Sequence, residues 1–194
     1  MNISLFPNNI VNSIDNINNI NNSNIIVPRT KYTLRIKIDG DIPDFCAEYY
    51  MNKNNKYAGS HRDDSGFDLI TPNDVLIDFL KVGKIDFKIK CEMINNETGR
   101  NAPYYIYPRS SITNTNFMLA NSVGIIDSNY RGNLQARLRN FSDDQSESVV
   151  KHMTKMVQIC TVDLSPFTIQ LASELSQSDR GEGGFGSTDR VVNS

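Results

Sequence analysis

NSVGIIDSNYRGNL, residues 121–134, is the stretch on which the interpretation of the whole chain depends. Its apolar run, residues 123–126, ends on Asp127, and a polar turn containing Tyr130 leads on toward Leu134. This pattern predicts a strand, a tight turn and a strand, that is, a β-hairpin. Asp127 would stand at a strand end, where a carboxylate serves either as a general base or as an ordinary turn residue. Alone, the stretch favours the structural interpretation.

The bulk properties of the chain exclude several classes of protein. The 194 residues, 39% of them hydrophobic, suit one domain of ordinary size with tails. A net charge of −2 predicts no nucleic-acid partner and no anionic-membrane surface, and no membrane span or signal peptide is evident. The widely spaced Cys46, Cys91 and Cys160 predict free, partly buried thiols in a reducing compartment, the cytoplasm or nucleus. His61 and His152 form no zinc-ligand spacing with them.

Three regions differ in composition. Residues 1–29 are rich in Asn and Ile and predict a disordered arm, residues 30–176 carry the pattern of a β domain, and residues 177–194 are rich in glycine. The aromatic residues of 41–56 recur at helical spacing, which predicts one short helix. Apolar and polar residues alternate, or β-favouring residues gather, in the segments 30–38, 74–79, 85–93, 104–107, 134–138, 156–162 and 167–171. The fold class is therefore all-β with one short helix.

Other polar residues stand at positions where a ligand site is one of two interpretations. Arg109-Ser110-Ser111 follows the run 104–107, and either serine is a candidate N-cap of a short helix whose free N–H groups would bind an anion. Gln158 interrupts an apolar strand, so it either meets a polar partner or faces outward. Asp68 is either a turn residue or a metal ligand acting through water.

The segment RGEGGFGST, residues 180–188, either closes over a ligand as a lid or remains a disordered tail. Its glycines let backbone N–H groups approach phosphates, Arg180 supplies charge, and Phe185 can stack on a flat ring. It lacks the lysine and the spacing of a P-loop. The arginine and the phenylalanine favour the lid.

In combination, these segments resemble trimeric deoxyuridine triphosphatases (dUTPases). That family carries five motifs in fixed order, and the counterparts here are SGFDL (65–69), PRSS (108–111), NSVGIIDSNYRGN (121–133), KMVQI (155–159) and RGEGGFGST (180–188). The resemblance extends from Lys31 to Thr188, and the spellings of the second and fifth motifs are similar to the apicomplexan branch. It implies a distorted jelly-roll barrel with a flexible C-terminal arm.

The resemblance also implies a reaction. The family hydrolyses dUTP to dUMP and pyrophosphate by Mg²⁺-assisted attack of water on the α-phosphate, which keeps uracil out of DNA and supplies dUMP for thymidylate synthesis. Asp127 would be the general base, and Asp68 would hold Mg²⁺ through water. The expected partners are dUTP and two further copies of the chain, in a homotrimer whose active sites are shared.

The substrate contacts follow by the same resemblance. Arg109, Ser110, Ser111 and Gln158 would hold phosphate oxygens. The uracil slot would consist of Asn121, Gly124, Ile125, Ile126 and Gln135, and Tyr130 would pack on the deoxyribose. In the arm, Phe185 would stack on the uracil, with Arg180, Ser187 and Thr188 at the γ-phosphate and Gly186 among the substrate contacts.

The chain departs from the family pattern at three places, and two other functions remain open. Ser111 and Asp189 stand where glycine is common, and Lys155 stands where the fourth motif often has arginine, so one charge remains without the bidentate fork. One alternative is a dCTP deaminase, which Tyr130 and the glycine-rich arm argue against. The other is a non-catalytic nucleotide-sensing or protein-interaction member of the fold, which the presence of Asp127 argues against.

Overall fold

The computed structural model describes residues 30–57, 64–178 and 181. The predicted N-terminal arm, residues 1–29, and all of the predicted lid except residues 177, 178 and 181 lie outside this part of the chain. The elements are β1 (Tyr32–Ile38), α2 (Asp44–Tyr57), β2 (Gly66–Asp68), β3 (Val75–Ile77), β4 (Val82–Asn95), β5 (Asn101–Ala102), β6 (Tyr104–Pro108), the 3₁₀ helix η1 (Ser110–Asn114), β7 (Phe117–Leu119), β8 (Gly124–Ile126), β9 (Asn133–Asn140), β10 (Ser148–Val150), β11 (Val157–Thr161) and β12 (Phe167–Leu171).

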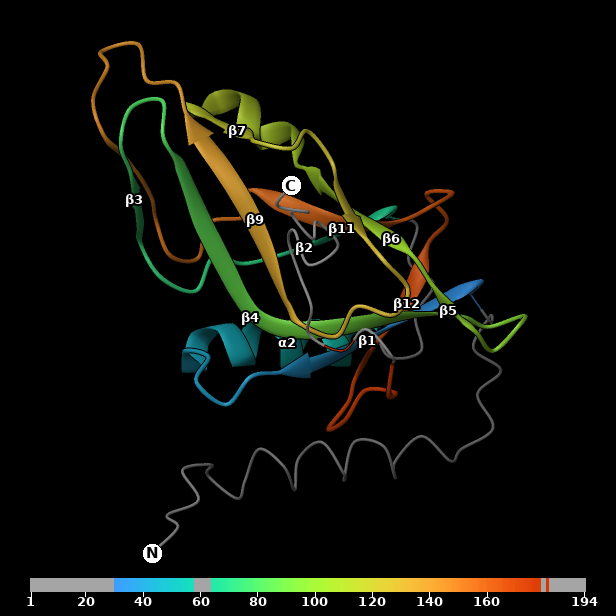
Figure 1. The fold of residues 1–194 in the computed structure, drawn as a ribbon. Coiled ribbons are helices and arrows are strands. Elements are labelled where there is room, and N and C mark those ends of the chain that lie inside the picture. Colours follow the sequence, from blue (N-terminus) through green and yellow to red (C-terminus); the bar gives the residue numbers. More distant parts are fainter. Residues whose placement is uncertain (1–29, 58–63, 179–180, 182–194) are drawn as a thin grey trace, which may run out of the picture.

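The strands form two main sheets and a small ribbon (Figure 1). The larger sheet has the order β12-β1-β4-β9-β7, with β5 added beside β4, and the second has the order β2-β11-β6-β8. Strands β10 and β3 pair separately, and β1 with β12 is the parallel pair among these strand pairings. This arrangement confirms the predicted all-β class, a distorted jelly-roll barrel with one short α-helix.

One hydrophobic core lies between the two main sheets. The alternation predicted for 30–38 is observed in β1, where Leu34 and Ile36 are fully buried, and residues from both sheets join the same core. The predicted helix is confirmed as α2, which buries Cys46 and Tyr50. Asn54 in its last turns accepts a hydrogen bond from the backbone N–H of Leu171 at 3.0 Å, so α2 is fixed to β12.

The predicted β-hairpin of residues 121–134 is wrong. Strand β8 pairs with β6 in the four-stranded sheet, whereas β9 pairs with β4 and β7 in the larger one. The connection at 127–132 therefore crosses from one sheet to the other. A crossing and a hairpin share the same local pattern of strand, turn and strand, and only the pairing partners, which are remote in sequence, distinguish them.

The three cysteines are free and buried, as the sequence predicted for free thiols. Burial raises the pKa of the Cys46 thiol to about 11 and also raises the pKa of Cys91. Within the described ranges, no helix combines the length and the apolar character that a bilayer crossing requires.

Candidate active site

A polar cavity of about 430 Å³ brings three of the five sequence motifs together. Antiparallel pairing explains the meeting, because Gln158 in β11 stands opposite Asp68 in β2, and β11 also pairs with the end of β6 at Pro108. The cavity is lined by Lys53, Asp64, Ser65, Gly66, Phe67, Asp68, Arg109, Ser110 and Gln158. Residues predicted to bind phosphate or metal, from the segments 65–69, 108–111 and 155–159, thus line the same cavity.

Arg109 is held in a fixed position at this cavity. Its Nε lies 2.7 Å from Oδ1 of Asp68, and both side chains are partly exposed. Its Nη1 donates to the hydroxyl of Ser111 at 3.3 Å and to the backbone carbonyl of Lys155 at 3.2 Å. A guanidinium oriented by several acceptors is prepared to bind an anion with little loss of side-chain freedom.

Gln158 meets a polar partner and does not simply face outward, which decides between the two interpretations of the sequence. Its Nε2 donates to the carbonyl of Pro108 at 3.4 Å. A Cβ added at Gly66 would lie 1.9 Å from Oε1 of Gln158, so the amide rests directly against the glycine backbone. The glycine of the first motif therefore makes room for the glutamine of the fourth.

The predicted capping by serine is wrong. The residue before η1 is Arg109, with an extended backbone and no capping side-chain hydrogen bond, and Ser110 is the first helical residue. A hydroxyl inside the first turn is past the position from which a side chain caps the following N–H groups. Ser110 lines the cavity and Ser111 contacts Arg109, so both stay near the predicted phosphate site without forming a helix cap.

Part of the predicted uracil slot lies on an edge strand. β8 is the last strand in the order of its sheet, so no described strand pairs with its second edge. In Gly124–Ile126, alternate residues direct their backbone N–H and C=O groups away from β6, so the open edge has the directional donors and acceptors that reading a base requires. A Cβ at Gly124 would lie 3.8 Å from Nδ2 of Asn121, which places the predicted amide beside the strand. Gln135 lies in the other sheet, opposite Asp86.

The crossing from β8 to β9 holds Asp127 and Tyr130. Asp127 is exposed at its start, and its carbonyl accepts the N–H of Tyr130 at 3.1 Å. The Tyr130 hydroxyl donates to the carbonyl of Asn133 at 2.8 Å, and a Cβ at Gly132 would lie 2.5 Å from that hydroxyl oxygen. The ring is therefore fixed across the glycine, and its residue is joined through the backbone to the predicted general base.

A buried ion-pair network beneath this crossing was not foreseen from the sequence. Glu92 has a side-chain exposure of 0% and pairs with both Arg35 and Arg131. Arg131 also donates from Nε to the carbonyl of Ser176 at 2.9 Å and from Nη1 to the carbonyl of Ser128 at 3.0 Å. The register of β1 with β4 places Arg35 opposite Glu92, but strand alternation alone assigned both to outward positions.

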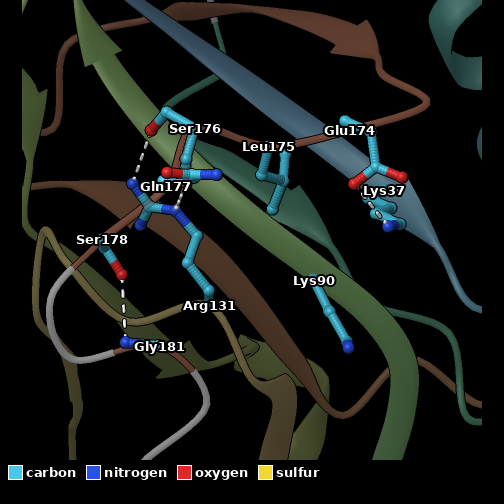
Figure 2. A pocket seen from close by; sticks show the side chains of 9 residues that line it. All are labelled: Lys37, Lys90, Arg131, Glu174, Leu175, Ser176, Gln177, Ser178 and Gly181. Carbon is cyan, nitrogen blue, oxygen red and sulfur yellow. Dashed lines mark hydrogen bonds and ion pairs between the residues drawn. The ribbon is translucent and has the colours of Figure 1, made fainter.

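The beginning of the C-terminal segment rests on the same crossing. Figure 2 shows Arg131 pointing toward Ser176, beside a cavity of about 360 Å³. Ser178 donates from Oγ to the carbonyl of Asn129 at 2.6 Å, and the N–H of Arg131 donates to the carbonyl of Gly181 at 2.8 Å. The predicted lid residues Arg180, Phe185, Gly186, Ser187 and Thr188 lie outside the described residues.

Comparison with known proteins identifies the family. The family model described as dUTPase matches residues 54–189, most of the chain. The chain belongs to the dUTPase family. It is 32% identical over 130 residues to deoxyuridine 5'-triphosphate nucleotidohydrolase of Clostridium kluyveri, a match that covers 66% of this chain and 86% of that protein. The protein of the same name from Clostridium tetani is 30% identical over 165 residues, covering 83% and 99%.

Solved structures of dUTPases are also similar to the chain. The crystal structure of dUTPase from Streptococcus mutans is 20% identical and has a TM-score of 0.47, and the match covers 64% of this chain and 91% of that one.

Within one dUTPase chain, the two parts of the candidate site lie apart. Tyr104 in β6 stands opposite Ile126, the residue before Asp127, whereas Arg109 follows the other end of β6. Arg109 lies five residues after Tyr104 along extended backbone, a distance of about 17 Å at about 3.3 Å per residue. The proposed base and the phosphate cavity therefore do not meet inside a single chain.

Proposed function

We propose that the protein hydrolyses dUTP to dUMP and pyrophosphate, with water attacking the α-phosphate. The observation that carries this proposal is the polar cavity in which Asp68, Arg109 and Gln158 converge, in a chain of the dUTPase family. Arg109, Ser110, Ser111 and Gln158 are the groups we assign to phosphate oxygens. The oriented guanidinium of Arg109 and the amide N–H of Gln158 would donate to the triphosphate, which carries about three or four negative charges. A cavity without a positive group would not favour so much negative charge.

A magnesium ion fits the donor chemistry of the cavity. Asp64 and Asp68 both line it, and carboxylate oxygens are ligands that Mg²⁺ prefers. No cluster of three or more His, Cys, Asp or Glu residues suited to a metal occurs within the described ranges, which agrees with an ion held by one or two carboxylates, water and substrate phosphates. When bound, Mg²⁺ would neutralise phosphate charge and make the α-phosphorus more electrophilic. We assign Asp68 to it, through water.

Asp127 is the proposed general base. Its exposed carboxylate at the end of β8 is able to orient water and to accept its proton, while the Tyr130 ring packs on the deoxyribose. The open edge of β8 would read the uracil through backbone groups of Gly124, Ile125 and Ile126, with Asn121 and Gln135 completing the slot. A fixed pattern of backbone donors and acceptors would reject cytosine, because the edge of cytosine would leave these backbone groups unpaired.

We infer that the active site is shared between chains of a homotrimer. The separation of about 17 Å along β6 supports this, since it exceeds the reach of a water held by Asp127 toward a phosphate held by Arg109. A neighbouring copy would bring its own Asp127 to the cavity of the first. The arm with Arg180, Phe185, Gly186, Ser187 and Thr188 would then close over the nucleotide.

Two finer assignments belong to the same proposal. The motif spellings PRSSI and RGEGGFGST support a place in the apicomplexan-like branch of the family. Three buried free thiols agree with a reducing compartment, so we propose the cytoplasm or nucleus, where removal of dUTP would keep uracil out of DNA.

The test of the function is pyrophosphate release from purified protein with Mg²⁺ and each of dUTP, dCTP, TTP and UTP. We expect release from dUTP and, at the same enzyme concentration, little from the other three. Ammonia release from dCTP would instead support a deaminase, and nucleotide binding without any product would support the non-catalytic alternative. Without Mg²⁺ and with EDTA present, the rate of pyrophosphate release from dUTP should fall. CaCl₂, added as a matched salt control, should not restore that rate fully.

A further inference from the structure

We propose that Lys53 of helix α2, which lies outside all five motifs, is an additional binding residue for the triphosphate. Lys53 lines the cavity together with Asp68, Arg109 and Gln158. The inference rests on the proposed function, because it names a further contact of the same substrate. It assigns α2 a role in substrate binding as well as in the core.

The packing of α2 fixes the position of Lys53 at the cavity. Tyr50, one turn before it, is fully buried, and its hydroxyl accepts the N–H of Ile70 at 3.4 Å. Asn54, the next residue, is buried and bound to the N–H of Leu171 at 3.0 Å. Because the helix is attached on both sides of Lys53, the stem of this lysine starts from a fixed backbone position beside the cavity.

The ring of Tyr49 contacts the ammonium groups of two lysines, Lys53 and Lys155. The Nζ of Lys53 lies 5.6 Å from the ring centroid, and the Nζ of Lys155 lies 5.2 Å from it, both within the range of a cation–π contact. The Tyr49 hydroxyl donates to the carbonyl of Asp68 at 3.2 Å. One aromatic side chain therefore holds two cations beside the strand that carries the proposed magnesium ligand.

The charges at the cavity explain what Lys53 adds. Arg109 is paired with Asp68, and Asp64 brings a second carboxylate to the lining. Against these, a nucleoside triphosphate brings about four negative charges, of which Mg²⁺ offsets about two. Ammonium groups on flexible stems follow a phosphate chain as point charges without requiring bidentate geometry. The chemical class recognised is thus the polyphosphate of a nucleotide, and the effect should grow with the number of phosphates.

The experiment compares Lys53→Met, which keeps the apolar stem, with Lys53→Arg and with Lys81→Met. Lys81 is exposed in the turn between β3 and β4 and is not among the cavity residues, so it controls for net charge. Binding of dUMP, dUDP and the non-hydrolysable α,β-imido analogue of dUTP is measured by calorimetry with Mg²⁺ at low and high salt. The melting temperature of each variant verifies folding.

We expect Lys53→Met to weaken binding of the imido analogue about tenfold and binding of dUMP less than about twofold. The affinity of this variant for the analogue should also depend less on salt. The Kd of Lys53→Arg for the analogue should stay within about threefold of wild type. The Kd of Lys81→Met should equal that of wild type. Unchanged analogue binding in Lys53→Met, or equal losses for dUMP and the analogue, would overturn the inference while wild type still binds dUTP. Failure of wild type to bind or hydrolyse dUTP is a different result, and it would overturn the proposed function itself.

Discussion

The guanidinium of Arg131 lies 3.1 Å from the carboxylate of Glu92, and both side chains are almost completely buried. This pair connects the crossing that carries Asp127 to the C-terminal part of β4, and Arg131 extends the connection to Ser176, just before the C-terminal segment. A single arginine thus positions both the proposed base and the beginning of the predicted lid.

Replacement of Arg131 should cost stability. Removing one partner of a buried ion pair typically costs roughly 3–5 kcal/mol, and because Arg35 still pairs with Glu92 we expect Arg131→Met to lie near the lower end. Urea unfolding measures the loss. Arg100→Met, in an exposed turn, is the control and should change the free energy of unfolding by less than about 0.5 kcal/mol. Equal stability of the two variants would contradict the anchoring role.

Gly66→Ala should impair substrate binding while the protein stays folded. The new Cβ would lie 1.9 Å from Oε1 of Gln158, and because that amide is the end of a flexible side chain, it moves away while the strand remains in place. We expect KM for dUTP to rise about fivefold to tenfold with a stability change below about 1 kcal/mol.

A double-mutant cycle tests the cause of that effect. If the alanine acts by displacing the amide, Gln158→Ala should raise KM by a similar factor, and Gly66→Ala combined with it should add little. Full additivity of the two changes would show that Gly66 acts independently of Gln158.

Arg109→Lys should weaken phosphate binding even though the charge is kept. A lysine has no counterpart to the Nη1 that donates to Ser111 and to the carbonyl of Lys155, and it offers no bidentate fork to a phosphate. We expect kcat/KM for dUTP to fall about tenfold or more, measured as initial rates of pyrophosphate release. The exposed Arg100→Lys is the matched control, and a wild-type value for Arg109→Lys would remove Arg109 from the site.

Acid lability should depend in part on Asp74. Its pKa is lowered by hydrogen bonds from the backbone N–H of His152, from Lys151 and from the His152 ring. A carboxylate with a depressed folded-state pKa stabilises the protein above its unfolded-state pKa, near pH 4, and this contribution is lost as pH falls further. Between about pH 5 and pH 3, the melting temperature of Asp74→Asn should therefore fall less than that of wild type. The exposed Asp143→Asn serves as control, and parallel curves for all three proteins would refute the role of Asp74.

The sequence predicted the strands well where one face of a strand is buried. Leu34 and Ile36 in β1 follow the period of two because one sheet face meets the core, and the aromatic spacing of α2 reports its buried face. The sequence could not predict that β8 and β9 belong to different sheets, because hydrogen-bond partners far along the chain decide this.

The sequence indicated several residues of the candidate site, but it did not indicate that they lie in two separate parts of one chain. The motifs named Asp68, Arg109 and Gln158, and the pairing of β2, β11 and β6 brings them together. Glu92 was missed because strand alternation treats a charged residue as outward, and only the contacts with Arg35 and Arg131 explain its burial. Lys53 was missed because it belongs to no motif and reaches the cavity from a helix.

The most direct test of the central claim, a dUTP-hydrolysing site shared between chains, mixes two inactive variants. Asp127→Asn should lose about 10²–10⁴-fold in turnover and still bind the imido analogue, because only the proton acceptor is removed. Arg109→Ala should lose turnover because the contacts of Arg109 with the phosphates are removed. When the two are unfolded together and refolded as a mixture, random assembly gives about one quarter of sites an intact Asp127 from one chain and an intact Arg109 from its neighbour. We predict about one quarter of the wild-type rate of pyrophosphate release from dUTP in the mixture, and a mixture as inactive as its separate components would contradict the shared site.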